Sequence, residues 1–257
     1  EYQSMRLEGK LGRKCSPGGV LKEYKAFRAT LNYAVDLKFI RANPFAAVKP
    51  GKLGLFDDNR SDIWFTKPEL EAFMPLLSDQ LRDLFEFRVW TGARPEEADR
   101  FGQGNINWED GTIWIQTIKK KRRQGGAMRK RYLTIKSLGP SLEALLRRLK
   151  PHPVTGLMFA RPETGQPYCD RYLLTAFQAA VRKASIVKRK LPRPYDLRGT
   201  FATHRAMMRI SFRQLQIELG HSSPISIRNY LDEATHCTEK DSIFFGVDVT
   251  AGWKEGV

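Results

Sequence analysis

Strand-like sequence is confined to one stretch of this chain, residues 106–135, and helical periodicity fills most of the rest. Three short runs in that stretch are rich in β-branched and aromatic residues: Ile106-Asn107-Trp108, Ile113-Trp114-Ile115 and Tyr132-Leu133-Thr134-Ile135. Asp110-Gly111 is typical of a tight hairpin turn between the first two runs. The chain is therefore predicted to have an α+β fold, mostly helical with one small antiparallel sheet.

The first 48 residues contain one strong helical pattern. Apolar residues recur there at three- and four-residue steps: Val20, Tyr24, Phe27, Leu31 and Val35. The pattern begins after Ser16-Pro17-Gly18-Gly19 and ends before Asn43-Pro44. One long helix is too little core for an independent domain, so we expect its packing partners to lie upstream of Glu1. Residues 49–62 are rich in Gly, Lys and Asp and are typical of a linker.

Residues 63–238 are predicted to form a second, larger domain. Thr66 and Glu69 have the spacing of a capping box at the start of a helix. Further helices are expected around Leu81 to Val89 and at 141–150, 170–185, 197–209, 211–219 and 223–231. Residues 239–257 form a C-terminal tail with a compact apolar cluster: Ile243, Phe244, Phe245, Val247 and Val249.

Net positive charge is the unusual feature of the composition. The chain has 44 Lys and Arg against 28 Asp and Glu, a formal net charge of +16. This balance indicates a polyanionic partner, either nucleic acid or an anionic membrane. No apolar run approaches the roughly 18 residues of a spanning helix and no leader segment opens the chain, so a membrane role is disfavoured.

The sequence lacks the residue patterns typical of zinc sites, disulfide frameworks and nucleotide-hydrolysing enzymes. The three cysteines, Cys15, Cys169 and Cys237, lie far apart and form no C-x-x-C pair, which argues against a zinc site or a disulfide framework and favours a reducing cytosol. The chain has no Gly-rich loop of the G-x-x-x-x-G-K-[ST] kind, so nucleotide hydrolysis has no visible machinery. We therefore expect neither a metal nor another cofactor.

Several polar residues in the second domain are candidates for chemistry, although each alone has an ordinary explanation as a solvated charge, an ion pair, a helix cap or a packing group. They are Arg94 in Thr91-Gly92-Ala93-Arg94, Lys119 in a basic hairpin, Arg198 in Tyr195-Asp196-Leu197-Arg198, His221 after Gly220, and Tyr230 nine residues later. Their order is more informative than any single member.

That order resembles the tyrosine recombinase (phage integrase) family over residues 62 to about 235. The resemblance implies that Arg94, Lys119, Arg198, His221 and Tyr230 are catalytic, with Lys120 or Lys121 as alternatives to Lys119. Residues 1–48 resemble the second half of the family's core-binding domain. Tyr195 stands where the family commonly has His. A phenol with a reference pKa of about 10 is mostly a hydrogen-bond donor near neutral pH, so whether Tyr195 takes part in proton transfer is left open.

This set of residues suits DNA strand transfer. Tyr230 would attack a phosphodiester in line, and the guanidinium groups of Arg94 and Arg198 would bind the nonbridging oxygens. His221 would donate a further hydrogen bond, and Lys119 would protonate the leaving 5′ oxygen. No metal would be needed, because the arginines supply the positive charge that Mg²⁺ supplies elsewhere. The covalent 3′-phosphotyrosine conserves the bond energy, so rejoining would need no ATP. Glu97 is better placed to orient an arginine or neighbouring amides than to react.

The expected partner is double-stranded DNA, held between the N-terminal helices and the second domain. Its phosphates would lie near basic side chains of the hairpin: Arg122, Arg123, Arg129, Lys130 and Arg131. The resemblance further implies a tetramer on DNA, with the tail docking into a neighbouring copy, although folding back onto its own domain is an alternative. Accessory DNA-bending proteins and a cytoplasmic, nucleoid-associated location complete this expectation.

Two other functions fit the same composition. A type IB topoisomerase would share the chemistry but would relax any supercoiled plasmid. A noncatalytic DNA-binding regulator would share the charge but would form no covalent adduct. The sequence does not specify the target site or the direction of the reaction.

Overall fold

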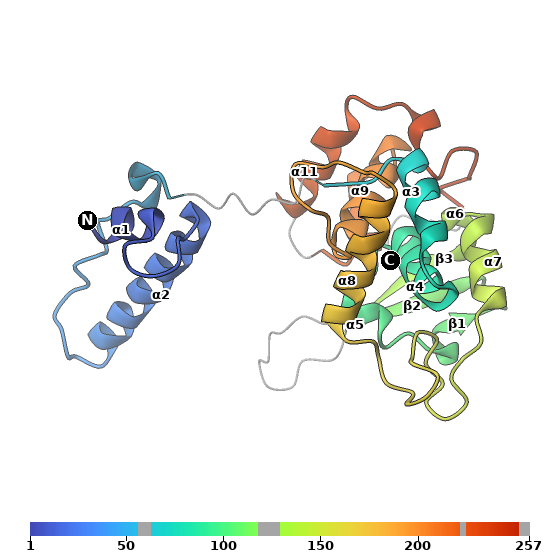
Figure 1. The fold of residues 1–257 in the computed structure, drawn as a ribbon, viewed down its shortest axis with the longest axis horizontal. Helices are drawn as coiled ribbons and strands as arrows, with labels where there is room; N and C mark the ends of the chain where they lie inside the picture. Colours follow the sequence, from blue (N-terminus) through green and yellow to red (C-terminus); the bar gives the residue numbers. More distant parts are fainter. Residues whose placement is uncertain (56–62, 118–128, 222–224, 252–257) are drawn as a thin grey trace. The chain divides into compact units, whose positions relative to one another are not determined.

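The computed structural model describes residues 1–55, 63–117, 129–221 and 225–251, and the chain divides into two units, Glu1–Ser61 and Asp62–Val257 (Figure 1). In the described residues of the second unit, the strands lie to one side and helices make up most of the rest. This arrangement confirms the predicted α+β class. Within the described residues, none of the helices combines the length and the apolar character needed to cross a bilayer.

The first unit contains α1 (Tyr2–Glu8), α2 (Pro17–Asp36) and the short 3-10 helix η1 (Pro50–Leu53). Ser16 caps α2 by accepting a hydrogen bond from the Gly19 amide, as its sequence predicts. Arg6 of α1 pairs with Glu23 of α2, where Nε lies 3.1 Å from the carboxylate. The sequence pattern did not predict α1.

The small core of this unit corrects the expected linker. Leu55 is buried with Val20 and Leu21, and the Tyr24 hydroxyl donates to the Val48 carbonyl at 2.6 Å. Residues 50–55 therefore belong to the first unit and not to a linker that begins at residue 49.

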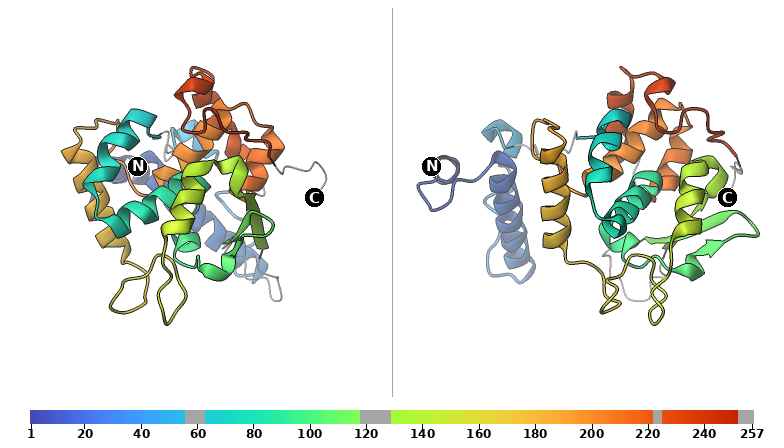
Figure 2. Two further views of the ribbon diagram at one scale, coloured as in Figure 1. Left: turned by 90° about the vertical axis from the view of Figure 1, so that its right-hand side faces the viewer. Right: turned by 45° about the vertical axis from the view of Figure 1, so that its right-hand side comes forward.

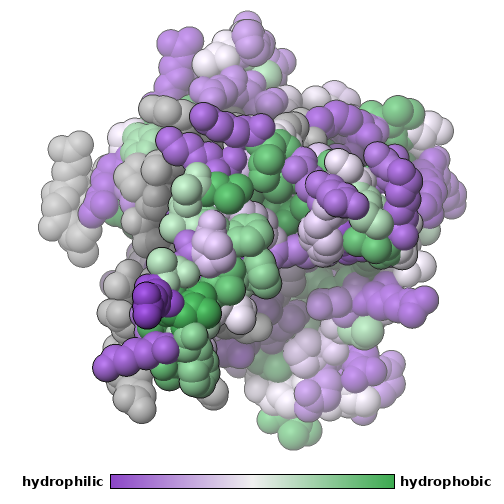
Figure 3. All heavy atoms as spheres, turned by 90° about the vertical axis from the view of Figure 1, so that its left-hand side faces the viewer, coloured by the Kyte–Doolittle hydropathy of each residue, from purple (hydrophilic) through white to green (hydrophobic). Residues whose placement is uncertain are grey.

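The face of the molecule in Figure 3 carries hydrophobic side chains among hydrophilic ones. Two large aromatic residues of the first unit, Phe27 and Phe39, are exposed.

The second unit begins with helices that follow their sequence signals. Thr66 and Glu69 form the predicted capping box of α3 (Lys67–Phe73), which runs into η2 (Met74–Leu76). Further along the chain lie α4 (Asp79–Thr91), α5 (Pro95–Ala98), α6 (Ile135–Leu138), α7 (Pro140–Arg148) and α8 (Asp170–Lys183). Phe65, Phe73, Phe85 and Phe177 pack ring against ring and join α3, α4 and α8.

The sheet has the order β1-β2-β3 and is antiparallel throughout. After η3 (Gln103–Asn105), its strands are β1 (Ile106–Asn107), β2 (Thr112–Thr117) and β3 (Arg129–Thr134). Ile113 pairs with Leu133 and Ile115 pairs with Arg131. Because side chains alternate across a strand and Ile113, Ile115 and Leu133 are buried, Arg131 lies on the inward face of the sheet.

The core of the second unit is built around α9 (Asp196–Met207), which packs against α4 and α11 (Ile225–Ala234). Every residue of α9 except Gly199 is buried, so this helix is surrounded by protein. Helix α10 (Phe212–Leu219) follows it, and η4 (Glu239–Asp241) lies beyond α11. The helices predicted at 197–209, 211–219 and 223–231 are confirmed to within a few residues.

The apolar cluster of the C-terminal tail contacts its own domain, which is the alternative to docking into a neighbouring copy. The segment after α11 lies against the body of the unit in both views of Figure 2. Phe244 is completely buried, with its ring 5.3 Å from that of Trp90 and 5.9 Å from that of Phe201. The Ser242 hydroxyl donates to the His204 carbonyl at 2.8 Å. Within the apolar cluster, Phe244 and Val249 are thus buried in their own domain, whereas Phe245 is exposed.

Candidate active site

Arg94 is placed by the turn that ends α4. Gly92 has a φ of 62°, and a Cβ atom there would lie 2.6 Å from the Phe201 ring, so glycine permits both the left-handed turn and the close approach to α9. Arg94 then caps α5. Its amide donates to Glu97 Oε2 at 3.0 Å, and its Nη1 lies 2.6 Å from Glu97 Oε1. The Arg94 side chain keeps 21% of its surface exposed, so it can reach a bound phosphate.

Arg198 lies in the first turn of α9 and is 1% exposed. Its Nη1 donates to the Gly92 carbonyl at 2.5 Å, and its Nη2 donates to the Leu219 carbonyl. Its Nε has no hydrogen-bond partner among the described residues. Burial, reinforced by the neighbouring charges of Arg131 and Arg94, lowers the pKa of Arg198 to about 9. The group is still protonated at neutral pH, as an anion-binding role requires.

Glu97 organises these arginines. Its carboxylate is fully buried, 3.1 Å from Arg131 Nη2 and 3.9 Å from Arg198 Nη1. Burial alone would raise the pKa of Glu97, but the charges of Arg131 and Arg198 outweigh it, so the pKa lies below its ordinary value. An ionised carboxylate here fixes the arginines, in agreement with the orienting role expected for Glu97.

The basic hairpin is only partly described. Residues 119–123, with the candidate acid Lys119, its alternatives Lys120 and Lys121, and the expected DNA contacts Arg122 and Arg123, lie outside the described residues, as does the Arg129 side chain. Lys130 is exposed, with its Nζ 3.9 Å above the centre of the Trp114 ring. Lys130 therefore lies on the solvent-facing side of β3.

Arg131, one of the expected phosphate contacts, is buried, unlike its neighbour Lys130. Its side chain is 3% exposed, and its guanidinium is engaged with the Thr91 and Glu218 carbonyls and with Glu97. The physical reason is its place in the strand, because residues 131, 133 and 135 alternate inward with 130, 132 and 134 outward. That alternation was the sequence signal that could have separated Arg131 from its basic neighbours.

His221 follows the end of α10. Gly220 has a φ of 61° and ends the helix, and a Cβ atom there would lie 3.2 Å from Thr117 Oγ1 at the end of β2. The His221 amide donates to the Gln216 carbonyl at 3.0 Å, and Gln216 Nε2 donates back to the His221 carbonyl at 3.1 Å. These bonds hold the half-buried His221 beside the strand that leads into the basic hairpin.

Tyr230 lies on α11, against the first turn of α9. A Cβ atom on Gly199, the neighbour of Arg198, would lie 3.8 Å from its ring. Burial raises the pKa of Tyr230 above its ordinary value, while Arg198 and Arg94 act in the opposite direction. The phenol is therefore protonated at neutral pH and must lose its proton during any attack.

Tyr195 is the N-cap residue of α9 and is 46% exposed. The carbonyl of the preceding Pro194 accepts a 2.7 Å hydrogen bond from Arg88, a buried arginine that we did not single out in the sequence. Arg88 thus fixes the turn that leads to Arg198.

Among the described residues, no three His, Cys, Asp or Glu side chains gather in a group that could hold a metal ion.

Solved structures with the same fold come from DNA-bound recombinases. The Tn1549 transposon integrase in complex with circular intermediate DNA has a TM-score of 0.70 and 20% identity, over 93% of this chain and 81% of that chain. A lambda integrase dimer bound to a COC′ core site has a TM-score of 0.68 and 19% identity, over 94% and 80%. The XerH site-specific recombinase bound to palindromic difH substrate has a TM-score of 0.52 and 25% identity, over 71% and 54%.

Comparison with curated proteins gives no match. The family model for the phage integrase family, in contrast, matches residues 64–236, which include Arg94, Arg198, His221 and Tyr230. This match spans more than half of the chain and lies within the second unit. The chain therefore belongs to the phage integrase family, the tyrosine site-specific DNA recombinases.

Proposed function

We propose that Tyr230 is the nucleophile of this recombinase and that Arg94, Arg198 and His221 bind the scissile phosphate. The observation that carries the assignment is the packing of Tyr230 against the first turn of α9, next to Arg198, whose charge and that of Arg94 both act on its phenol. Glu97 pairs with the same two arginines. A nucleophile beside two guanidinium groups is the arrangement that in-line attack on a phosphodiester requires.

The chemistry follows from these groups. As the bond from Tyr230 Oη to phosphorus forms, the bond from phosphorus to the 5′ oxygen breaks, and the phenol releases its proton to solvent. Negative charge on the nonbridging oxygens is stabilised by the arginines, and the leaving oxygen takes a proton from Lys119. Attack by another 5′ hydroxyl reverses the step on a new strand, and the tyrosine is released. The 3′-phosphotyrosine bond conserves the energy of the original linkage, so no ATP is consumed.

We also propose that cleavage is independent of metal ions. Arg94 and Arg198 supply positive charge at the position where a phosphoryl-transfer enzyme would otherwise use Mg²⁺. The Arg198 pKa of about 9 leaves this charge in place at neutral pH.

The partner in this proposal is double-stranded DNA, supported by the net charge of +16 and by the DNA complexes of proteins with the same fold. The finer proposal is a tetramer on DNA, with accessory DNA-bending proteins and a nucleoid location. Burial of Phe244 within its own domain supports packing of this part of the tail in cis over its exchange between copies.

Covalent trapping tests the assignment of Tyr230. Tyr230→Phe should remove a denaturant-resistant protein–DNA adduct and leave DNA binding within a few-fold, because only the nucleophilic oxygen is lost. Tyr172→Phe is the matched control, since Tyr172 is 53% exposed on α8. The substrate is a nicked duplex of the cognate site, found by sequencing DNA trapped on the wild-type protein. An adduct that survives in Tyr230→Phe would refute the proposal.

A further inference from the structure

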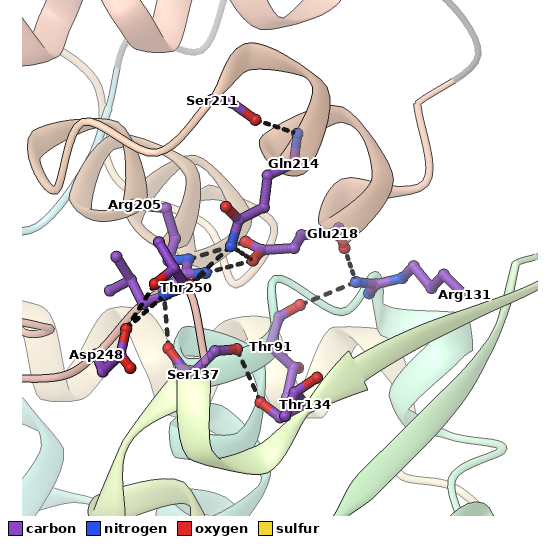
Figure 4. A network of polar contacts seen from close by, with 11 residues as sticks. Thr91, Arg131, Thr134, Ser137, Arg205, Ser211, Gln214, Glu218, Asp248 and Thr250 are labelled. Carbon is purple, nitrogen blue, oxygen red and sulfur yellow. Dashed lines mark hydrogen bonds and ion pairs between the residues drawn. The ribbon is translucent and has the colours of Figure 1, made fainter. Parts of the chain in front are cut away.

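Two arginines join the same two helix ends in the second unit. Arg198 donates to the carbonyls of Gly92 and Leu219. Arg131 donates to the carbonyls one residue earlier in each case, Thr91 at 3.1 Å and Glu218. Thr91 ends α4 and Glu218 lies in the last turn of α10, where helix carbonyls lack partners within the helix and carry partial negative charge. Each guanidinium therefore bridges two helix C-termini (Figure 4, for Arg131).

These two helix ends carry residues of the proposed site. The end of α4 leads through Gly92 to Arg94, and the end of α10 leads through Gly220 to His221. Arg131 also reaches Glu97 Oε2 with its Nη2, while Glu97 Oε1 holds Arg94. The relative placement of Arg94 and His221 thus depends on contacts that Arg131 makes.

We propose that Arg131 is a positioning residue for strand cleavage: it holds Glu97 and the two helix ends in register and does not contact DNA. The inference rests on the proposed function of Arg94 and His221. It is carried by geometry, since three acceptors surround a side chain that is 3% exposed. A planar guanidinium can serve three acceptors at fixed angles, whereas an ammonium is a point charge on a flexible stem.

Loss of Arg131 leaves two buried carbonyls without their partner and reduces the positive charge around Glu97. A misplacement of about 1 Å at a reacting centre can lower the rate about 100-fold. We expect Arg131→Met and Arg131→Lys to lower single-turnover cleavage by about this factor. DNA affinity should stay within a few-fold, and the slope of log affinity against log salt concentration should not change. A phosphate-contacting arginine would instead reduce that slope by about 1 when it is removed.

The pH dependence of cleavage separates positioning from general support of the fold. The charged groups that approach Glu97 in the described residues are Arg94 beside it, Arg131 from β3 and Arg198 from α9. Without Arg131, Glu97 takes up its proton at a higher pH, and protonated Glu97 no longer holds Arg94. The acid side of the cleavage profile should therefore move to higher pH in Arg131→Met but less in Arg131→Lys, which keeps a positive charge.

Arg205 provides the matched control. It is also fully buried, and its Nε donates to the carboxylate of Glu218 at 2.8 Å, on the same helix α10 (Figure 4). It does not appear among the ion pairs of Glu97. Arg205→Met should lower thermal stability as Arg131→Met does, but the cleavage of its folded fraction should keep the wild-type pH profile.

The experiment measures adduct formation on the nicked cognate duplex between pH 5.5 and 8, together with DNA affinity at several salt concentrations. If wild-type protein forms no adduct, the proposed function itself fails. If wild-type protein cleaves and Arg131→Lys cleaves equally well, positioning by Arg131 is overturned. A salt slope reduced by about 1, or an acid-side shift of the same size in Arg205→Met, overturns it as well. Should Arg131→Met not fold, Arg131→Lys still gives the rate and the salt slope.

Discussion

Replacement of Phe244 by alanine tests whether the C-terminal tail belongs to its own domain. Phe244 is completely buried, packed edge to face against Trp90 and Phe201, with the Arg205 guanidinium 5.0 Å from its ring centre. Replacing a core phenylalanine by alanine costs about 3–5 kcal/mol, because the transfer free energy is lost and a cavity remains. For a domain of 150–250 residues, 1 kcal/mol corresponds to about 2–4 °C in Tm. Phe244→Ala should therefore lower Tm by about 6–20 °C.

The assay is thermal unfolding of the free protein, followed by circular dichroism at several protein concentrations. Phe245→Ala is the matched control, because the adjacent ring is 54% exposed and its loss should change Tm little. A milder variant, Phe244→Leu, should cost less than alanine and covers the case in which alanine prevents folding.

One outcome would refute this reasoning. If Phe244→Ala and Phe245→Ala both have the Tm of wild type when no DNA is present, Phe244 does not stabilise its own domain. Docking into a neighbouring copy would then be favoured, and the loss should appear only in assemblies on DNA.

The remaining predictions concern the metal, the buried histidine and the hairpin. Covalent cleavage should survive excess EDTA, and strict dependence of the adduct on Mg²⁺ would contradict the arginine-based mechanism. Burial lowers the pKa of His204 to about 4 from its ordinary value of about 6.5. Between these two pH values His204 binds a proton in the unfolded chain but not in the folded chain. The free energy of unfolding should accordingly fall by up to about 3 kcal/mol as pH drops from 6.5 to 4, and His204→Gln should reduce this dependence whereas the exposed His236→Gln should not. A substrate with sulfur at the leaving position should restore cleavage to Lys119→Ala, and rescue of Lys120→Ala instead would move the acid by one residue.

Local signals in the sequence were sufficient for most of the elements. The capping box at Thr66 and Glu69 depends on residues three apart, and the structure contains it as predicted. The Asp110-Gly111 turn and the apolar runs beside it predicted the paired strands β1 and β2. Such signals predict structure because the interactions behind them involve only a few residues that are neighbours in the sequence. Helix α1 was not predicted, and its contacts with α2 include an ion pair between residues 17 positions apart.

The orienting role of Glu97 could also be anticipated, since it lies one helical turn beyond Arg94 and pairs with it. The third arginine of that cluster could not be found in the same way. Arg131 lies on a strand 34 residues after Glu97. A run of basic residues is expected to be exposed to solvent unless other segments are known to cover one face of the sheet.

The sequence by itself determined the helical and strand periods, the family to which the chain belongs, and the order of Arg94, Arg198, His221 and Tyr230. Only the tertiary structure decided which arginines are buried among backbone carbonyls, as Arg131 and Arg198 are, which one keeps exposed surface, as Arg94 does, and that Phe244 of the tail packs within its own domain. The physical reason is that the residues flanking a charged or apolar side chain in the sequence are the same whether the folded protein buries or exposes it. Its burial, and therefore its role, depends on segments distant in the chain, such as those that cover Arg131 and Phe244.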